Sequence, residues 1–172
     1  MMNIRIAETN DIEKILTVLE SGREFLRFQG LSQWQGVYGP SRHLNEDIAN
    51  NWGYVLILQE EEMICGYAAL IDGVDECYSA IKDGCWDNSH EKYISIHSVA
   101  IGAGFRGKGF AEPFMQGLIK TAGDMGYRDI RIDTHPKNKI MQKVILRAGF
   151  VYRGMVEFGI PDGKRMAYQL IR

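Results

Sequence analysis

A glycine-rich stretch, IGAGFRGKGFAEPF (Ile101–Phe114), lies between a run of strand-forming residues and an amphipathic helical pattern. Pro113 constrains this stretch most, because proline inside a helix removes a hydrogen bond and clashes with the preceding turn, at a cost of about 3 kcal/mol. In the first turn the missing N–H costs nothing, since those donors have no intrahelical partner. The helix is therefore predicted to begin near Gly109, after a loop that leaves the strand.

The same glycines allow a dinucleotide interpretation. Gly102, Gly104 and Gly107 spell G-x-G-x-x-G, and Asp133 ends the next strand-like run. That fingerprint requires the helix to begin within the glycines, which the position of Pro113 opposes. Only 65 residues follow Gly107, too few for two mononucleotide-binding halves. Binding of NAD is therefore the weakest of the alternatives.

The segment Arg106–Ala111 (RGKGFA) has the properties of an anion site. Its glycines let a phosphate approach the backbone N–H groups, and the dipole of the following helix favours negative charge. Arg106 and Lys108 add positive charge. The competing interpretation is a tight strand-to-helix turn that carries two surface cations.

Hydrophobic periodicity divides the rest of the chain into strands and helices. Strands are predicted at residues 3–8, 54–59, 63–71, 92–101, 129–135, 150–158 and 165–171. Helices are predicted from Ile12 through Leu19, within 42–51, and at 78–82, 110–125 and 138–148. Residues 21–40 are aromatic and broken by glycine, and Glu60–Glu62 form a polar turn. This order predicts an α/β fold with a mixed sheet that has helices on both faces.

Composition narrows the class of protein. A length of 172 residues fits one domain, 1–172, and a net charge of −2 gives no electrostatic reason to expect nucleic acid as a partner. The three cysteines are odd in number and form no C-x-x-C pair, so neither a disulfide framework nor a metal site is expected. The sequence shows no signal peptide and no membrane span, so a cytoplasmic protein is expected.

Two segments together resemble the GNAT superfamily of N-acetyltransferases. R-G-K-G-F-A matches that family's acetyl-coenzyme A pattern Q/R-x-x-G-x-G/A, and SVAI precedes it as the family's fourth strand does. DTHPKNKIMQKVILRAGF (Asp133–Phe150) is similar to the second half of the cofactor site. The resemblance implies the GNAT-like acyl-CoA N-acyltransferase fold, with about seven strands and about four helices.

The resemblance also implies how acetyl-CoA is held and used. The backbone of Val99, Ala100 and Ile101 would pair with the pantetheine arm as another strand does. Its pyrophosphate would meet the amides of the loop residues Arg106, Gly107, Lys108, Gly109, Phe110 and Ala111. Asn138 would contact the arm near the acetyl group, and Thr134, His135 and Lys143 are further candidate contacts. The acetyl group would pass directly to a primary amine of a small molecule or peptide.

Such a transfer benefits from a general base, because free amines are mostly protonated at neutral pH. His97 is the candidate, since it precedes the cofactor-facing part of its strand and histidine titrates near neutral pH. A hydrogen-bonded core histidine is the alternative interpretation. A backbone N–H near Val99–Ile101 is the natural donor to the thioester oxygen. Many family members carry a tyrosine as the acid where this sequence has Ile145, so no acid is assigned.

The acceptor amine remains open. Trp34, Tyr38 and Trp86 lie in segments that usually form the acceptor pocket in this family, although ordinary packing under long loops is the favoured interpretation of such aromatics. Glu24, Glu46 and Asp47 could attract a cationic amine, but they are interpreted as surface charges. The missing tyrosine keeps a second function open, a non-catalytic CoA-binding sensor. Homodimers are common in the family, so a homodimer is a candidate state.

Overall fold

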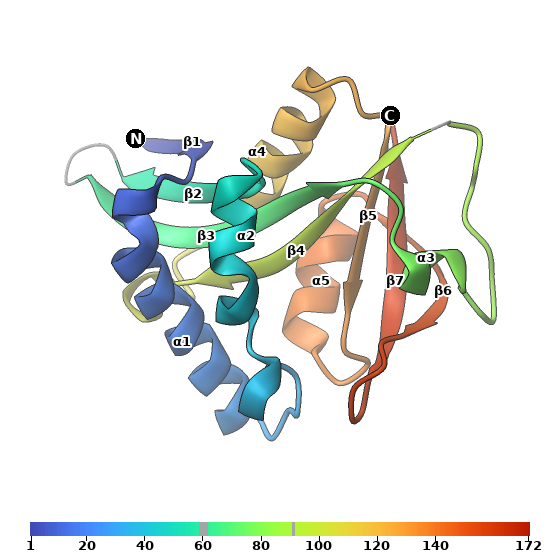
Figure 1. Cartoon of the computed structure of the whole chain (residues 1–172), viewed down its shortest axis with the longest axis horizontal. Helices are drawn as coiled ribbons and strands as arrows, with labels where there is room; N and C mark the ends of the chain where they lie inside the picture. The colour runs from blue at the N-terminus through green and yellow to red at the C-terminus, as the bar shows by residue number, and fades with distance from the viewer. Residues whose placement is uncertain (59–61, 91) are drawn as a thin grey trace. The chain divides into compact units, whose positions relative to one another are not determined.

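The computed structural model describes residues 1–58, 62–90 and 92–172 (Figure 1). Seven strands form a sheet in the order β1-β2-β3-β4-β5-β7-β6. The strands are β1 (Met2–Ile6), β2 (Gly53–Leu58), β3 (Met63–Asp72), β4 (Tyr93–Ile101), β5 (Asp129–Thr134), β6 (Val151–Glu157) and β7 (Lys164–Ile171). The α-helices are α1 (Ile12–Phe28), α2 (Leu44–Ala49), α3 (Glu76–Ser79), α4 (Ala111–Asp124) and α5 (Lys139–Arg147). This confirms the predicted α/β class with a mixed seven-stranded sheet.

Contacts within the chain define two compact units. The first comprises Met1–Leu70 and His97–Phe114, and the second comprises Ile71–Ile96 and Met115–Arg172. Both β3 and β4 contribute residues to each unit. The assignment of the chain to a single domain stays a prediction.

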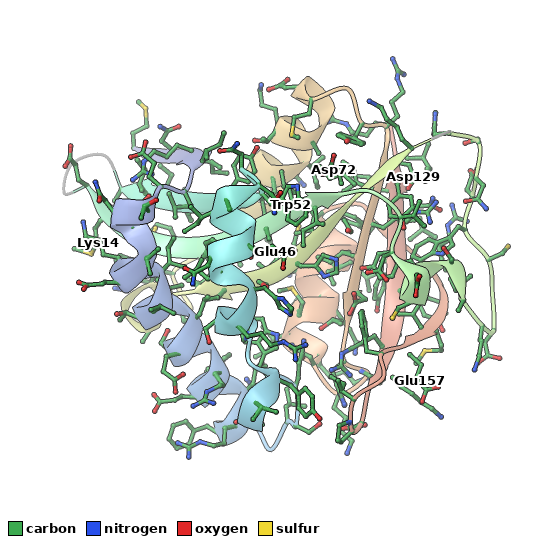
Figure 2. The ribbon with its side chains drawn as sticks, in the orientation of Figure 1. Lys14, Glu46, Trp52, Asp72, Asp129 and Glu157 are labelled. Carbon is green, nitrogen blue, oxygen red and sulfur yellow. The ribbon has the colours of Figure 1, made fainter. Side chains whose placement is uncertain are left out.

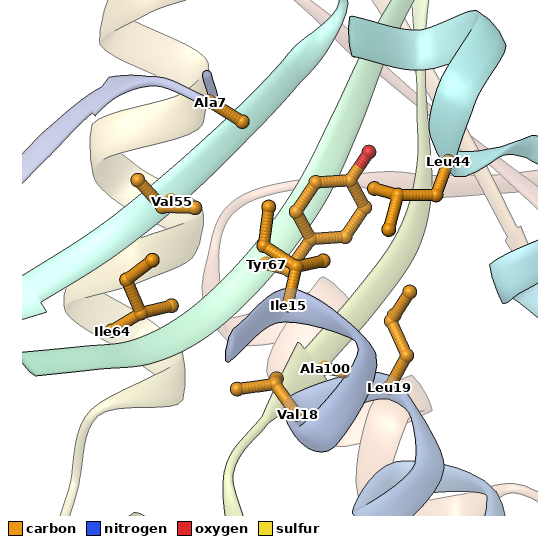
Figure 3. Packing of buried hydrophobic residues seen from close by; sticks show 9 residues of the cluster. All are labelled: Ala7, Ile15, Val18, Leu19, Leu44, Val55, Ile64, Tyr67 and Ala100. Carbon is orange, nitrogen blue, oxygen red and sulfur yellow. The ribbon is translucent and has the colours of Figure 1, made fainter. Parts of the chain in front are cut away.

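The first unit packs α1 and α2 against antiparallel strands. β1 pairs with β2 from Met2↔Leu58 to Ile6↔Tyr54, and β2 pairs with β3 with a register shift at Leu56/Ile57. The buried core between these elements consists of Ala7, Ile15, Val18, Leu19, Leu44, Val55, Ile64, Tyr67 and Ala100 (Figure 3). The apolar positions of α1 recur at helical spacing, so one face of this helix covers the strands.

The second unit is built on strands of both directions. The first half of β4 runs parallel to β5, whereas β7 is antiparallel to both β5 and β6. Arg131 of β5 is 4% exposed, and its guanidinium carbon lies 4.3 Å from the ring centroid of Trp86 and 3.8 Å from that of Tyr93. Its Nη2 donates to Asp129 Oδ2 at 2.8 Å. The buried cation thus has a carboxylate and two aromatic faces as partners.

The sequence pattern misplaced the end of the first helix. The pattern stopped at Leu19, but α1 continues to Phe28 through Gly22. A Cβ at Gly22 would lie 3.1 Å from Trp34 Cζ3. The glycine therefore makes room for the Trp34 ring and does not end the helix.

The remaining boundaries lie close to expectation. The short helix predicted at 78–82 occurs as α3, with the Asp75 side chain accepting from the amides of Cys77 and Tyr78. The turn predicted at Glu60–Glu62 falls largely outside the described residues, as does the end of the strand predicted at 54–59. No helix among the described residues has the length and apolar character needed to cross a membrane.

Candidate functional site

β4 changes its pairing along its length. Tyr93–Ile96 pair in parallel with Asp129–Ile132 of β5, and among the described residues this ladder extends no further along β4. In the part of the chain that the structure describes, Val99, Ala100 and Ile101 therefore lie on a stretch of β4 beyond its pairs with β5. An extended ligand arm can add to such a stretch as a strand would.

One extra residue shapes the same stretch of β4. Ser95 Oγ donates to the Ile71 carbonyl at 3.1 Å, and Gly102 N donates to the Cys65 carbonyl at 2.9 Å. These two links tie β4 to β3 on either side of Ser98. Ser98 takes a left-handed φ of +58°, as expected for a β-bulge with one additional residue. Because side chains alternate along a strand, the bulge brings His97 and Ala100 to the same face, although they are three residues apart.

The loop after β4 confirms the helix start predicted from Pro113. A 3-10 turn covers Ala103–Phe105, α4 begins at Ala111, and Pro113 lies in its first turn. Gly107 and Gly109 take φ values of +71° and +81°. A Cβ at either glycine would have no atom within 4 Å, so their backbone is open to an approaching group. Exposed glycines at the N-terminus of a 14-residue helix provide the geometry of an anion site.

The two cations of this loop have different roles. Arg106 Nε donates to the Ile101 carbonyl at 3.0 Å, and its Nη2 donates to Ser21 Oγ of α1 at 2.7 Å. Its guanidinium carbon also lies 4.6 Å from the ring centroid of Phe25, and burial lowers the pKa of this arginine. Arg106 therefore attaches the loop to α1, whereas Lys108 is the exposed cation.

His97 is half-buried on β4, and the structure adds an unexpected carboxylate near it. Asp47 of α2, interpreted from sequence as a surface charge, is only 2% exposed. Tyr67 Oη donates to Asp47 Oδ2 at 2.8 Å. Burial raises the pKa of Asp47, and the Tyr67 hydrogen bond and the charges of His43 and His97 oppose this rise. The spacing of Leu44, Asp47 and Ile48 was the available signal, because it places Asp47 on the apolar face of a helix.

The second unit holds the other predicted cofactor contacts. Thr134 at the end of β5 is fully buried, and its Oγ1 has no hydrogen-bond partner among the described residues. Asn138 caps α5, with Oδ1 accepting from Met141 N at 3.1 Å. Lys143 is exposed on α5. A buried hydroxyl without a partner requires an explanation, and a bound ligand provides one.

His135 is engaged within the chain. Its Nδ1 accepts from Lys137 N at 3.1 Å, which places the proton of the neutral ring on Nε2, 2.8 Å from Asp162 Oδ2. The side chain is 3% exposed. Both ring nitrogens thus have protein partners, and any polar contact of His135 with a cofactor would have to displace one of them.

Tyr93 and Tyr152 are the candidates to replace the tyrosine that is missing at Ile145, and both have protein partners in the structure. Ile145 is fully buried in α5. Tyr93 Oη accepts from Asp75 N at 2.6 Å while its ring covers Arg131. Tyr152 is 42% exposed on β6, and its ring packs edge-on against that of Tyr168.

The predicted acceptor aromatics separate into two groups. Trp86 is 7% exposed, its Nε1 donates to the Tyr78 carbonyl at 2.6 Å, and its ring covers Arg131. Trp86 is therefore part of a core and is poorly placed to bind an acceptor. Trp34 and Tyr38 are half-buried in the first unit, where Trp34 packs against the core and the Tyr38 ring lies under Arg42.

Comparisons with known proteins agree with this geometry. The model of the acetyltransferase (GNAT) family matches residues 20–150. The uncharacterized N-acetyltransferase YesJ of Bacillus subtilis is 25% identical over 148 residues, which cover 84% of this chain and 78% of the relative. The crystal structure of a GNAT-family acetyltransferase from Streptococcus agalactiae is 38% identical, with a TM-score of 0.88 over 99% of this chain and 95% of that chain.

A more distant structure shares the fold. It is that of the aminoglycoside acetyltransferase AAC(6')-Ib in complex with coenzyme A, which is 18% identical. Its TM-score is 0.68, and the match covers 100% of this chain and 95% of that chain. The chain therefore belongs to the GNAT family and is an acetyl-CoA-dependent N-acetyltransferase.

Proposed function

We propose that this enzyme transfers the acetyl group of acetyl-CoA directly to a primary amine of a small molecule or peptide, within a ternary complex. The observation that carries the proposal is the open loop Arg106–Ala111 at the start of α4, directly after a stretch of β4 for which no β5 partner lies among the described residues. A pyrophosphate and an extended amide-containing arm need these two features side by side.

The residues present fit the cofactor. A phosphate would occupy the space beside Gly107 and Gly109 that a Cβ would fill, with Lys108 as the nearby cation. The amides and carbonyls of Val99–Ile101 would hold the pantetheine arm. In the second unit, Thr134, Asn138 and Lys143 stay predicted contacts, and the buried Thr134 hydroxyl would gain its missing partner.

Acetyl-CoA supplies a thioester whose acyl carbon is open to attack by a neutral amine. His97 would accept the proton that the amine loses, directly or through water. A backbone N–H of Val99–Ile101 would donate to the thioester oxygen as negative charge develops on it. No side chain is assigned as the acid, because Ile145 has no acidic proton to donate and the CoA thiolate can leave without being protonated.

A thiol-release assay with acetyl-CoA and a panel of small amines and peptide N-termini tests the proposal. His97→Gln should lower kcat/KM about 100-fold and remove the acidic limb of its pH profile, while the Kd for CoA is unchanged. His90→Gln is the matched control and should leave both quantities unchanged.

Two results would contradict parts of this proposal. If His97→Gln keeps wild-type kcat/KM at every pH, His97 is not the base. If CoA binds tightly and no amine in the panel is acetylated, the non-catalytic CoA sensor, which the buried Ile145 favours, becomes the better description.

A further inference from the structure

Asp47 is a buried carboxylate that has few polar groups around it to stabilise its negative charge. It is 2% exposed, and Tyr67, which donates its side-chain hydrogen bond, is itself fully buried in the apolar core of the first unit. Figure 3 shows the Tyr67 ring among Ile15, Leu19 and Leu44, with its hydroxyl group extending from β3. An ionised carboxylate in such surroundings costs free energy unless it interacts with further polar or charged groups.

The bulge in β4 identifies such a group. Ala100 and Tyr67 belong to the same core cluster, so both side chains lie on the face of the sheet that α1 and α2 cover. The extra residue at Ser98 places His97 on the same face as Ala100. The imidazole therefore lies on the side of the sheet where Tyr67 holds Asp47, in agreement with the electrostatic interaction between Asp47 and His97.

We propose that Asp47 is a positioning residue for His97: its buried carboxylate, held by the Tyr67 hydroxyl, stabilises the imidazolium that forms when His97 accepts a proton. This proposal builds on the role of His97 in the proposed function. Without the carboxylate, the protonated ring would lie near apolar side chains with less compensation, and His97 would be a weaker base.

Other charged groups also act on this carboxylate and enter the test. His43 precedes α2 and is exposed, with its Nε2 accepting from Arg42 Nε at 2.9 Å. Glu46 is exposed on α2 beside Asp47 (Figure 2). Glu46→Gln removes the same unit of charge from the same helix, so it is the matched control for Asp47→Asn.

The first experiment follows the ring resonances of His97 by NMR as the pH is changed, and it does not depend on turnover. In Asp47→Asn the midpoint of the His97 titration should move to lower pH relative to wild type, and in Glu46→Gln by much less. Tyr67→Phe, which leaves the carboxylate without its donor, should give a smaller shift in the same direction. This second variant keeps the test available if Asp47→Asn does not fold.

The second experiment measures kcat/KM against pH with an amine that the wild-type enzyme is found to acetylate. Asp47→Asn should move the acidic limb to lower pH and reduce the plateau about tenfold, with the KM for acetyl-CoA unchanged. In the His97→Gln background Asp47→Asn should have no further effect, because its action passes through His97. Equal His97 titrations in wild type and Asp47→Asn would overturn the proposal even if acetyl transfer is confirmed. If the His97 titration shifts but the protein has no activity, the role of Asp47 toward His97 is supported and only the proposed function is contradicted.

Discussion

Gly109→Ala tests whether the open loop before α4 is the pyrophosphate site. Gly109 takes φ +81°, and a Cβ there would have no protein atom within 4 Å. The new methyl group would therefore not clash with the protein. It would project into the space that the proposal assigns to a phosphate approaching the loop amides.

The expected magnitudes follow from this geometry. Alanine in the left-handed region costs about 1–2 kcal/mol, and the reduced freedom of the unfolded chain offsets about 0.4–1 kcal/mol of this. A net loss of about 1 kcal/mol would lower Tm by about 2–4 °C in a chain of this size. Loss of two charge-assisted hydrogen bonds, at about 1.5 kcal/mol each, would weaken CoA binding on the order of 100-fold.

Gly30→Ala separates the two effects. Gly30 follows α1 with φ +73° and equally open surroundings, so it carries the same backbone cost outside the loop. Thermal melting should give similar Tm losses for both variants, whereas calorimetry with CoA should show weaker binding for Gly109→Ala alone. A Kd for CoA that is the same in the two variants would refute the assignment of the pyrophosphate to this loop.

Two other substitutions give sharp expectations. Arg106→Lys should raise the Kd for CoA about three- to tenfold by calorimetry, because lysine cannot reproduce the paired donation and the stacking on Phe25 that hold the loop. The hydrogen bond from Arg5 is the main cause that lowers the pKa of Asp11. The Asp11 carboxylate therefore stabilises the fold fully above the pKa of an ordinary carboxyl group, about 3.8, and this stabilisation is lost as the pH falls through the lower pKa of the folded state. Asp11→Asn should therefore reduce the free energy of unfolding by about 0.5–1 kcal/mol at pH 7 in denaturant titrations, and the difference from wild type should vanish at about pH 2.

Local rules predicted much of the loop between β4 and α4. Pro113 indicated where α4 starts, because the rule concerns only a helix and its own first turn. The strands followed from period-two alternation, because this pattern also depends only on residues that are close in the sequence. The family pattern was then sufficient to expect the open glycines.

Interactions distant in sequence could not be predicted in this way. The side chain of Arg106 was expected to add positive charge to an anion site, but Ser21 and Phe25, which lie about 80 residues earlier, hold its guanidinium. The helical pattern was followed only to Leu19 and residues 21–40 were interpreted as broken by glycine, because the contact of Gly22 with Trp34 exists only in the folded chain. Asp47 was classed as a surface charge although its helical position indicated the buried face, since most aspartates in short polar segments are solvated.

The attachment of Arg106 to α1 has a thermodynamic consequence. Because the loop is ordered by the fold, much of the entropy needed to arrange its amides is lost during folding and not during binding. The stability of the second half of α1 and the affinity for CoA are then linked, and the linkage is reciprocal. Changes that loosen α1 around Ser21 should weaken CoA binding from a distance. Bound CoA should in turn slow amide hydrogen exchange in that part of α1.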